Sequence, residues 1–474
     1  MKEQTTFLTT SKHRLLKMAD VEIVSTCLVG AAGAPTPERS KIELTPWDLQ
    51  LLLVGSIQKG LLFPKPTPQQ QQHHVIHSTL IDRLKISLSA TLDFFPPLAG
   101  RFATDEEDEK NNTSTVFVDC NNAGVEFVEA KAAGVTVAAI LDPSNDGAAQ
   151  TIRSFFPLNG IRNCDGICKP LLGVQVTELL DGYFIGCTLN HALGDGASFW
   201  NFFRSWSELS RGCPQISEPP ILDRWFPENI TRPVRLPMAL NKERRSLGCM
   251  KTPPENAERV FRLSREAIAK LKENVNSELG MPNSNPIISS LQAYMAHIWV
   301  SVNRARELDG DEDVQLSIPI GTRSRVPLPE GYWGNALYVK MVSAKAGELL
   351  EKGVGWAALK LKETVEKQRR EEVMNEYVRW VRSPAFLSEK KNYLARNTLV
   401  ISSSPRFDMY GADFGWGKPV AVRSGMGNKS DGKVTLLAGP EEGSVDIELC
   451  ILPQTLMRLC NDPAFMEYFT IPGC

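Results

Sequence analysis

Histidine is scarce in this chain, and one histidine stands where it could act on a substrate. The six histidines are His13, His73, His74, His77, His191 and His297. His191 directly follows a strand-like segment, at the point where a chain leaves a sheet and side chains can face a cleft. A neutral imidazole with a pKa near ~6.5 could take a proton there from an attacking hydroxyl or amine. We therefore interpret His191 as a candidate general base, whereas His297 lies among apolar residues and is typical of a core histidine.

The residues after His191 predict a loop. Asp195 follows four positions later, and a helix would place both side chains on one face, as a metal site could require. Gly194 and Gly196 disfavour that helix and indicate a tight turn. No HExxH motif or third ligand stands nearby, so we expect no metal site, and the lack of GxSxG disfavours a nucleophilic serine. Taken alone, the HxxxD spacing also fits a loop histidine followed by a capping aspartate.

A second motif, far along the chain, makes the match to the first more specific. Residues 413–419 read DFGWGKP, with two glycines and two aromatics in a short span. This composition is typical of a rigid backbone corner with aromatic packing, and it offers no acid–base pair. The combination of HALGD at 191–195 with DFGWGKP resembles the BAHD acyltransferases, the plant HXXXD-type family that acylates alcohols and amines from acyl-CoA.

The resemblance extends over nearly the whole chain from Met18. It includes LTPWD at 44–48, IQKG at 57–60, PLAGR at 97–101 and YWGN at 332–335. The segments at 196–203 and 402–407 look like those of a less-characterised branch of that family.

The resemblance implies an α/β fold of two similar mixed-sheet domains, related to chloramphenicol acetyltransferase. Coenzyme A would enter a channel between the domains from one mouth and the acceptor from the other. The family pattern has Asp195 pointing away from the substrate and pairing with an arginine, for which Arg323 is the best match and Arg325 the competitor. Asp195 would then orient the catalytic loop and relay no proton. The DFGWG residues are implied to be structural: Asp413, Phe414, Gly415, Trp416 and Gly417.

One position departs from the family pattern. Hydroxycinnamoyl transferases of the family carry a tryptophan nine residues before the DFGWG aspartate, where it lines the acceptor site. Ser404 stands there in this chain, within a triple serine. We expect a differently shaped acceptor pocket, in which Ser402 or Ser404 could donate a hydrogen bond to the developing oxyanion.

Several elements must position these residues. A hairpin is predicted from Val174–Leu180 and Tyr183–Asn190, joined by Asp181-Gly182 in a type I′ turn. Tyr183, Ile185, Cys187 and Leu189 should share one face of the second strand. Helices are expected over 77–92 and 197–209. In the second half we expect helices over 286–300 and 354–380 and strands over 314–320, 397–403, 434–437 and 445–451.

Length and composition bound the domain organisation. The 474 residues exceed what one hydrophobic core usually holds, so two domains are expected. With the resemblance, we expect an N-terminal domain over 18–228 joined by a crossing segment at about 411–436, a linker over 229–250 and a C-terminal domain over 251–474. Residues 1–17 are expected to be a disordered extension, since they lack the apolar core of a secretory signal.

Charge and cysteine content limit the partners and the compartment. The 53 basic and 55 acidic residues give a net charge of −2, which argues against a nucleic-acid footprint or a polybasic membrane anchor. No apolar run approaches the ~20 residues that span a bilayer. The ten scattered cysteines read as reduced thiols, so we expect a cytoplasmic protein. We also expect a monomer.

The expected function is acyl-CoA-dependent transfer to the hydroxyl or amine of a small, specialised metabolite, without a covalent enzyme intermediate. Acyl-CoA would be a co-substrate, and no permanently bound cofactor is expected. Two alternatives stay open: a lyase or other chemistry without coenzyme A in the same cleft, and a non-catalytic small-molecule-binding protein.

Overall fold

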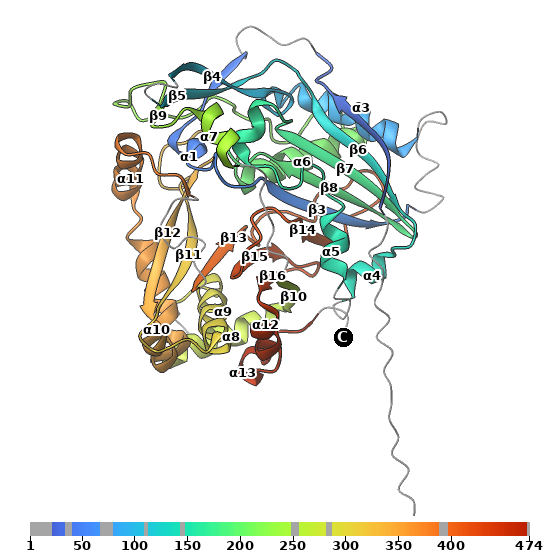
Figure 1. The fold of residues 1–474 in the computed structure, drawn as a ribbon. Coiled ribbons are helices and arrows are strands. Elements are labelled where there is room, and N and C mark those ends of the chain that lie inside the picture. Colours follow the sequence, from blue (N-terminus) through green and yellow to red (C-terminus); the bar gives the residue numbers. More distant parts are fainter. Residues whose placement is uncertain are drawn as a thin grey trace, which may run out of the picture.

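Two six-stranded mixed sheets form the body of the protein (Figure 1). The structure is a computed structural model and describes residues 21–33, 40–66, 79–108, 112–142, 147–247, 256–280, 287–387 and 397–471. The predicted extension at 1–17 and the histidines at positions 13, 73, 74 and 77 lie outside the described residues.

The first sheet carries the hairpin that leads to His191. Its strands, in spatial order, are β1 (Glu22–Val29), β6 (Val125–Ala132), β7 (Leu172–Leu179), β8 (Gly182–Leu189), β3 (Ile57–Pro64) and β14 (Ala421–Ser424). All neighbours are antiparallel except β6 and β7. The edge strand β14 comes from late in the sequence, so the second half of the chain completes the first sheet.

The second sheet is built from the C-terminal half alone. Its strands, in spatial order, are β10 (Ala257–Leu263), β16 (Val445–Ile451), β15 (Lys433–Ala438), β13 (Thr398–Ser402), β11 (Asp313–Gly321) and β12 (Leu337–Lys345). In β16 the alternating apolar side chains belong to one hydrophobic core, and the polar residues between them point to the opposite face. That opposite face is the one turned toward the first sheet, since Ser424 of β14 hydrogen-bonds Glu448 of β16.

A smaller third sheet and the helices complete the fold. The sheet has the order β2 (Lys41–Glu43), β5 (Thr113–Asp119) and β4 (Arg101–Asp108), with β9 (Arg235–Leu236) also paired to β5. The helices of the first half are α1 (Pro46–Leu49), α3 (Leu80–Leu92), α4 (Val137–Leu141), α5 (Ala148–Arg153), α6 (Gly196–Ser210) and α7 (Leu240–Leu247), with 3₁₀ turns η2 (Pro96–Ala99) and η3 (Asn163–Ile167). Those of the second half are α8 (Arg265–Glu278), α9 (Ser290–Arg306), α10 (Ala346–Glu366), α11 (Arg370–Arg382), α12 (Pro453–Cys460) and α13 (Pro463–Met466).

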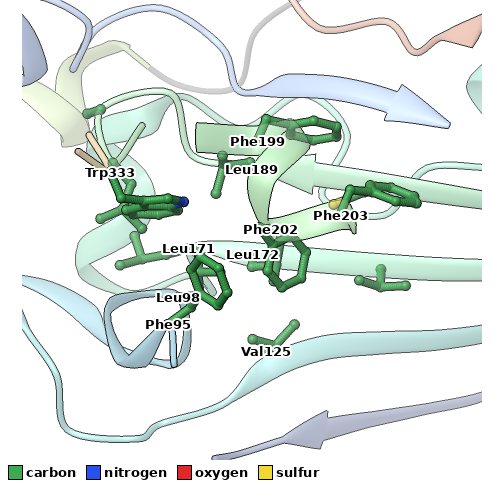
Figure 2. Packing of buried hydrophobic residues seen from close by; sticks show 14 of the residues in the cluster. Phe95, Leu98, Val125, Leu171, Leu172, Leu189, Phe199, Phe202, Phe203 and Trp333 are labelled. Atoms are coloured by element: carbon green, nitrogen blue, oxygen red, sulfur yellow. The ribbon is translucent and has the colours of Figure 1, made fainter. Parts of the chain in front are cut away.

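The core beside the first sheet fixes helix α6, whose N-terminus adjoins His191. Phe199, Phe202 and Phe203 of α6 are fully buried with Leu189 of β8 (Figure 2). Trp333, from the second half of the chain, belongs to the same core and contacts Phe95 with a ring-centroid distance of 5.8 Å. The apolar packing therefore runs across both halves and holds α6 rigidly.

Most expected elements are confirmed, including the two-domain mixed α/β architecture. Tyr183, Ile185, Cys187 and Leu189 do face one core. The predicted single helix over 354–380 is wrong: the chain forms α10 and α11, separated at Lys367–Arg369.

The predicted type I′ turn is also wrong. Neither Asp181 nor Gly182 has a positive φ. Gly182 is required for a different reason, because a Cβ there would lie 2.4 Å from the carbonyl oxygen of Phe63 on the neighbouring strand. The side chain of Asp181 accepts a hydrogen bond from the amide of Val137 at 2.7 Å and ties the turn to α4.

No helix among the described residues has the length and apolar character needed to cross a bilayer.

Candidate active site

His191 lies in a short turn between β8 and α6. The loop predicted from Gly194 and Gly196 is confirmed, since the helix begins only at Gly196. The residue is half-buried, and its Nδ1 atom is buried without a hydrogen-bond partner in the described part of the chain.

Two asparagines hold the backbone of His191 from both sides. The side-chain oxygen of Asn163 accepts a hydrogen bond from the amide of His191 at 2.8 Å. The side chain of Asn335 donates to the carbonyl oxygen of His191 at 2.7 Å. Asn163 is anchored in turn by donation to the carbonyl of Leu51 at 2.8 Å, and Asn335 by donation to Asp48 at 2.9 Å. The peptide units around the imidazole are thus fixed by side chains from distant segments.

Asp48 is the buried anchor of this network. It belongs to a capping box with Thr45 at the start of α1, which explains why the short helix forms. Its carboxylate also forms an ion pair with Arg224 at 3.2 Å, and both side chains are almost fully buried. Arg224 donates to the carbonyl of Leu193 at 2.7 Å, so the anchor reaches the middle of the histidine loop.

Asp195 closes the loop and caps α6. Its Oδ1 accepts from the amide of Ser198 at 3.1 Å, and its Oδ2 accepts from the amide of Ala336 at 3.1 Å. Arg323 forms a two-pronged ion pair with this carboxylate, with Nη2 to Oδ1 at 3.0 Å. Asp195 is only 4% exposed, and both of its carboxylate oxygens are occupied by contacts within the protein.

The competing arginine is engaged elsewhere. Arg325 donates from Nε to the carbonyl of Gln368 at 2.7 Å and from Nη1 to the carbonyl of Gly321. The structure therefore brings Asp195 together with Arg323, not with Arg325.

The surroundings favour a neutral imidazole at His191. Burial is the largest influence and lowers its pKa. The backbone of His191 and Gly194 and the carboxylate of Asp195 act in the opposite direction, whereas the ammonium of Lys433 lowers the pKa further. An uncharged ring at neutral pH can accept a proton, as a general base must.

The two candidate serines occupy different environments. The hydroxyl oxygen of Ser402 lies 3.3 Å from both the carbonyl oxygen of Val434 and the hydroxyl oxygen of Thr435, and its single proton can be donated to one of them at a time. The hydroxyl of Ser404 accepts from the amide of Arg406 at 3.3 Å, inside a turn. No hydrogen bond in the described ranges joins either serine to His191.

The DFGWG motif forms a corner that packs on α6. Asp413 accepts from the amides of Gly415 and Gly417 at 2.8 and 2.9 Å, and both glycines have φ near +100°. The rings of Phe414 and Trp416 stack with centroids 5.6 Å apart. Phe414 also meets Trp206 of α6 edge-on at 4.9 Å, so the motif braces the helix that Asp195 caps.

Sequence reasoning missed several residues of the site. Asp48 and Asn335 stand within the LTPWD and YWGN segments, so the sequence marked both positions. It did not indicate that their side chains form a hydrogen bond. Asn163, Arg224 and Lys433 carried no recognisable signal. Among the described residues, no group of three histidine, cysteine or acidic side chains is arranged to hold a metal ion.

The chain matches known proteins over nearly its full length. Residues 19–466 match the Transferase family. An uncharacterized acetyltransferase of Arabidopsis thaliana is 37% identical, covering 95% of this chain and 99% of that protein. The BAHD acyltransferase DCR of the same plant is 32% identical, covering 91% and 90%. The crystal structure of TRI101 from F. graminearum, complexed with coenzyme A and T-2 mycotoxin, superposes with a TM-score of 0.71 at 18% identity, covering 91% of this chain and 100% of that one.

Proposed function

This chain belongs to the Transferase family and is a BAHD acyltransferase, and from that membership we propose that His191 is the general base of acyl transfer from coenzyme A. The acceptor is the hydroxyl or amine of a small, specialised metabolite. The observation that carries this proposal is the fixed histidine loop: a half-buried imidazole of lowered pKa whose backbone is held on both sides.

The chemistry needs no covalent enzyme intermediate, because a thioester is already activated. The neutral ring of His191 takes the proton of the acceptor as its oxygen or nitrogen bonds to the thioester carbonyl carbon. The tetrahedral oxyanion then collapses, the carbon–sulfur bond breaks, and the imidazolium returns its proton to the thiolate of coenzyme A. Since Nδ1 is buried, we assign proton transfer to Nε2.

The other site residues have supporting roles in this proposal. Asp195 and Arg323 position the loop, since the carboxylate is saturated by the guanidinium and two amides. Ser402 is the better placed oxyanion donor of the two serines, because it pairs with Thr435, two residues from Lys433 on the same face of β15. The DFGWG corner is structural.

Acyl-CoA serves as a co-substrate in this proposal, with no permanent cofactor. The coenzyme A complex of TRI101 supports it, since that protein has the same fold. We propose domains over 18–228 and 251–474 joined by the linker at 229–250. The pairing of β14 with β3 supports a crossing segment at about 411–436. We further propose that the protein acts as a cytoplasmic monomer.

A donor-by-acceptor panel tests the proposal. Wild-type protein is first screened by thermal shift with acetyl-, malonyl- and hydroxycinnamoyl-CoA, because a ligand of the native state raises its stability. Each stabilising donor is then incubated with alcohol and amine acceptors, and acylated products are detected by mass spectrometry. The proposal expects stabilisation and His191-dependent products. Absence of stabilisation by every donor would favour chemistry without coenzyme A.

A further inference from the structure

The surface between the two sheets is unusually rich in buried charge. Glu258 of β10, Lys433 of β15 and Glu448 of β16 all lie on the polar face of the second sheet, and all are buried or nearly so. Charges in such a setting require partners, because an isolated buried charge is strongly destabilising.

The acidic groups of this face are each neutralised by a nearby cation. Lys429 forms ion pairs with Glu258 at 2.8 Å and with Glu448 at 3.4 Å. Arg262 forms an ion pair with Asp446 at 2.7 Å. The carboxylates of the interface are therefore already occupied.

Two lysines of this region lack a direct ion pair among the described residues. Lys59 of β3 and Lys433 are 8% and 9% exposed, and neither makes an ion pair or side-chain hydrogen bond within the described residues. Burial is the largest influence on both groups. It lowers the pKa of Lys59 to about 7, although the carboxylate of Glu448, which Lys429 already pairs with, acts on Lys59 in the opposite direction. Burial, together with the charge of Lys429, lowers the pKa of Lys433 to about 8. An additional anion between the two side chains would favour their charged forms.

Both lysines lie close to the proposed base. Lys59 pairs in register with Ser424 of β14, whose amide donates to Glu448 of β16, and Glu448 pairs with Thr435, two residues from Lys433 on β15. The charge of Lys433 in turn lowers the pKa of His191. Lys59 is paired in register with Cys187, on the same face of the hairpin as Leu189, two residues before His191. Lys59 therefore lies on the strand next to the one that leads into His191, and Lys433 lies on the facing side of the second sheet.

We propose that Lys59 and Lys433 form a subsite beside His191 that binds a carboxylate of a substrate. This inference rests on the proposed function and specifies its substrate class. A phosphate of coenzyme A is a poor occupant, because the pantetheine arm separates the phosphates from a thioester that reacts at His191. A carboxylate can come from a dicarboxylic acyl group or from a carboxylated acceptor.

Equilibrium binding distinguishes the two sources. Isothermal titration with the full-length protein measures Kd for malonyl-CoA against isovaleryl-CoA, which has the same shape without the charge. A second arm measures 4-hydroxycinnamate against 4-hydroxycinnamide in saturating coenzyme A. Wild-type protein should prefer the carboxylate of one pair by roughly tenfold or more, as expected for a buried, charge-assisted contact.

Neutral variants test the lysines themselves. Lys59→Met and Lys433→Met should each reduce that preference, the ratio of the two Kd values, by roughly tenfold. The matched control is Lys131→Met, an exposed lysine near the C-terminal end of β6, which should keep the ratio within about twofold.

The two pairs of ligands decide whether the subsite exists and which substrate it binds. A lysine-dependent preference in the first pair assigns the subsite to the acyl donor, and one in the second pair assigns it to the acceptor. Equal Kd values within both pairs for wild-type protein would overturn the subsite even if the variants fail to fold. These measurements need no turnover, so failure of the subsite is separable from failure of the proposed transfer, which is judged by products lost in His191→Ala.

Discussion

Breaking the Asp195–Arg323 pair should destabilise the protein and misalign His191 together. Asp195 is 4% exposed, so its charge needs the guanidinium, although the amides of Ser198 and Ala336 still compensate it when Arg323 is removed. A hydrogen bond to a charged group contributes roughly 1.5–3 kcal/mol, and the 34% exposure of Arg323 reduces its share. We therefore expect Arg323→Met to lower the free energy of unfolding by about 2 kcal/mol.

A double-mutant cycle isolates the interaction. Asp195→Asn and Arg323→Met are made singly and together, and the free energy of unfolding is measured by urea titration followed by tryptophan fluorescence. The double variant should lose less than the sum of the single losses by about 1–2 kcal/mol. In both single variants kcat should fall by a larger factor than KM changes, because the loop orients the imidazole of His191.

Arg325→Met provides the matched control two residues away. It removes a guanidinium that donates to backbone carbonyls of Gln368 and Gly321 and not to Asp195. The loss in free energy of unfolding that it causes should add to the loss caused by Asp195→Asn within about 0.5 kcal/mol. If Arg323→Met is equally additive with Asp195→Asn, the two residues are not coupled and the positioning argument is refuted.

Two further predictions concern pH. The charge of Lys433 adds to burial in lowering the pKa of His191, so Lys433→Met should move the acidic limb of the kcat/KM profile to higher pH; an unmoved limb would show that Lys433 does not act on the base. Burial alone would raise the pKa of Glu448, but Lys429 and Lys59 bring it from 4.5 down to about 2. Its stabilisation is therefore present above pH 4.5 and lost as pH falls toward 2. The free energy of unfolding of Glu448→Gln should vary less than that of wild type across that window, and identical pH dependence in urea titrations would contradict this.

Local patterns predicted much of what lies close in sequence. The loop at His191 followed from two glycines, and the hairpin followed from strand alternation. The turn geometry at Gly182 could not be predicted in this way. Glycine is required there because a side chain would clash with a carbonyl on β3, and not because the residue has a positive φ. The break between α10 and α11 was missed because the charged segment keeps helical composition across it.

Long-range partners could not be deduced from one sequence. Asn335 and Asp48 are 287 positions apart, and no local pattern states that their side chains meet. The same holds for Lys59 and Lys433, which read as ordinary strand lysines until the two sheets are placed face to face. The strand over 445–451 was predicted, but only the tertiary structure shows what its polar face covers.

The most direct test of His191 as the general base is single-turnover acyl transfer by His191→Ala, using the best donor and acceptor from the panel. We expect a rate lower by roughly 10²–10⁴-fold, with unchanged circular dichroism and urea unfolding. A correctly folded variant that transfers the acyl group at nearly the wild-type rate would contradict the assignment of His191 as the general base.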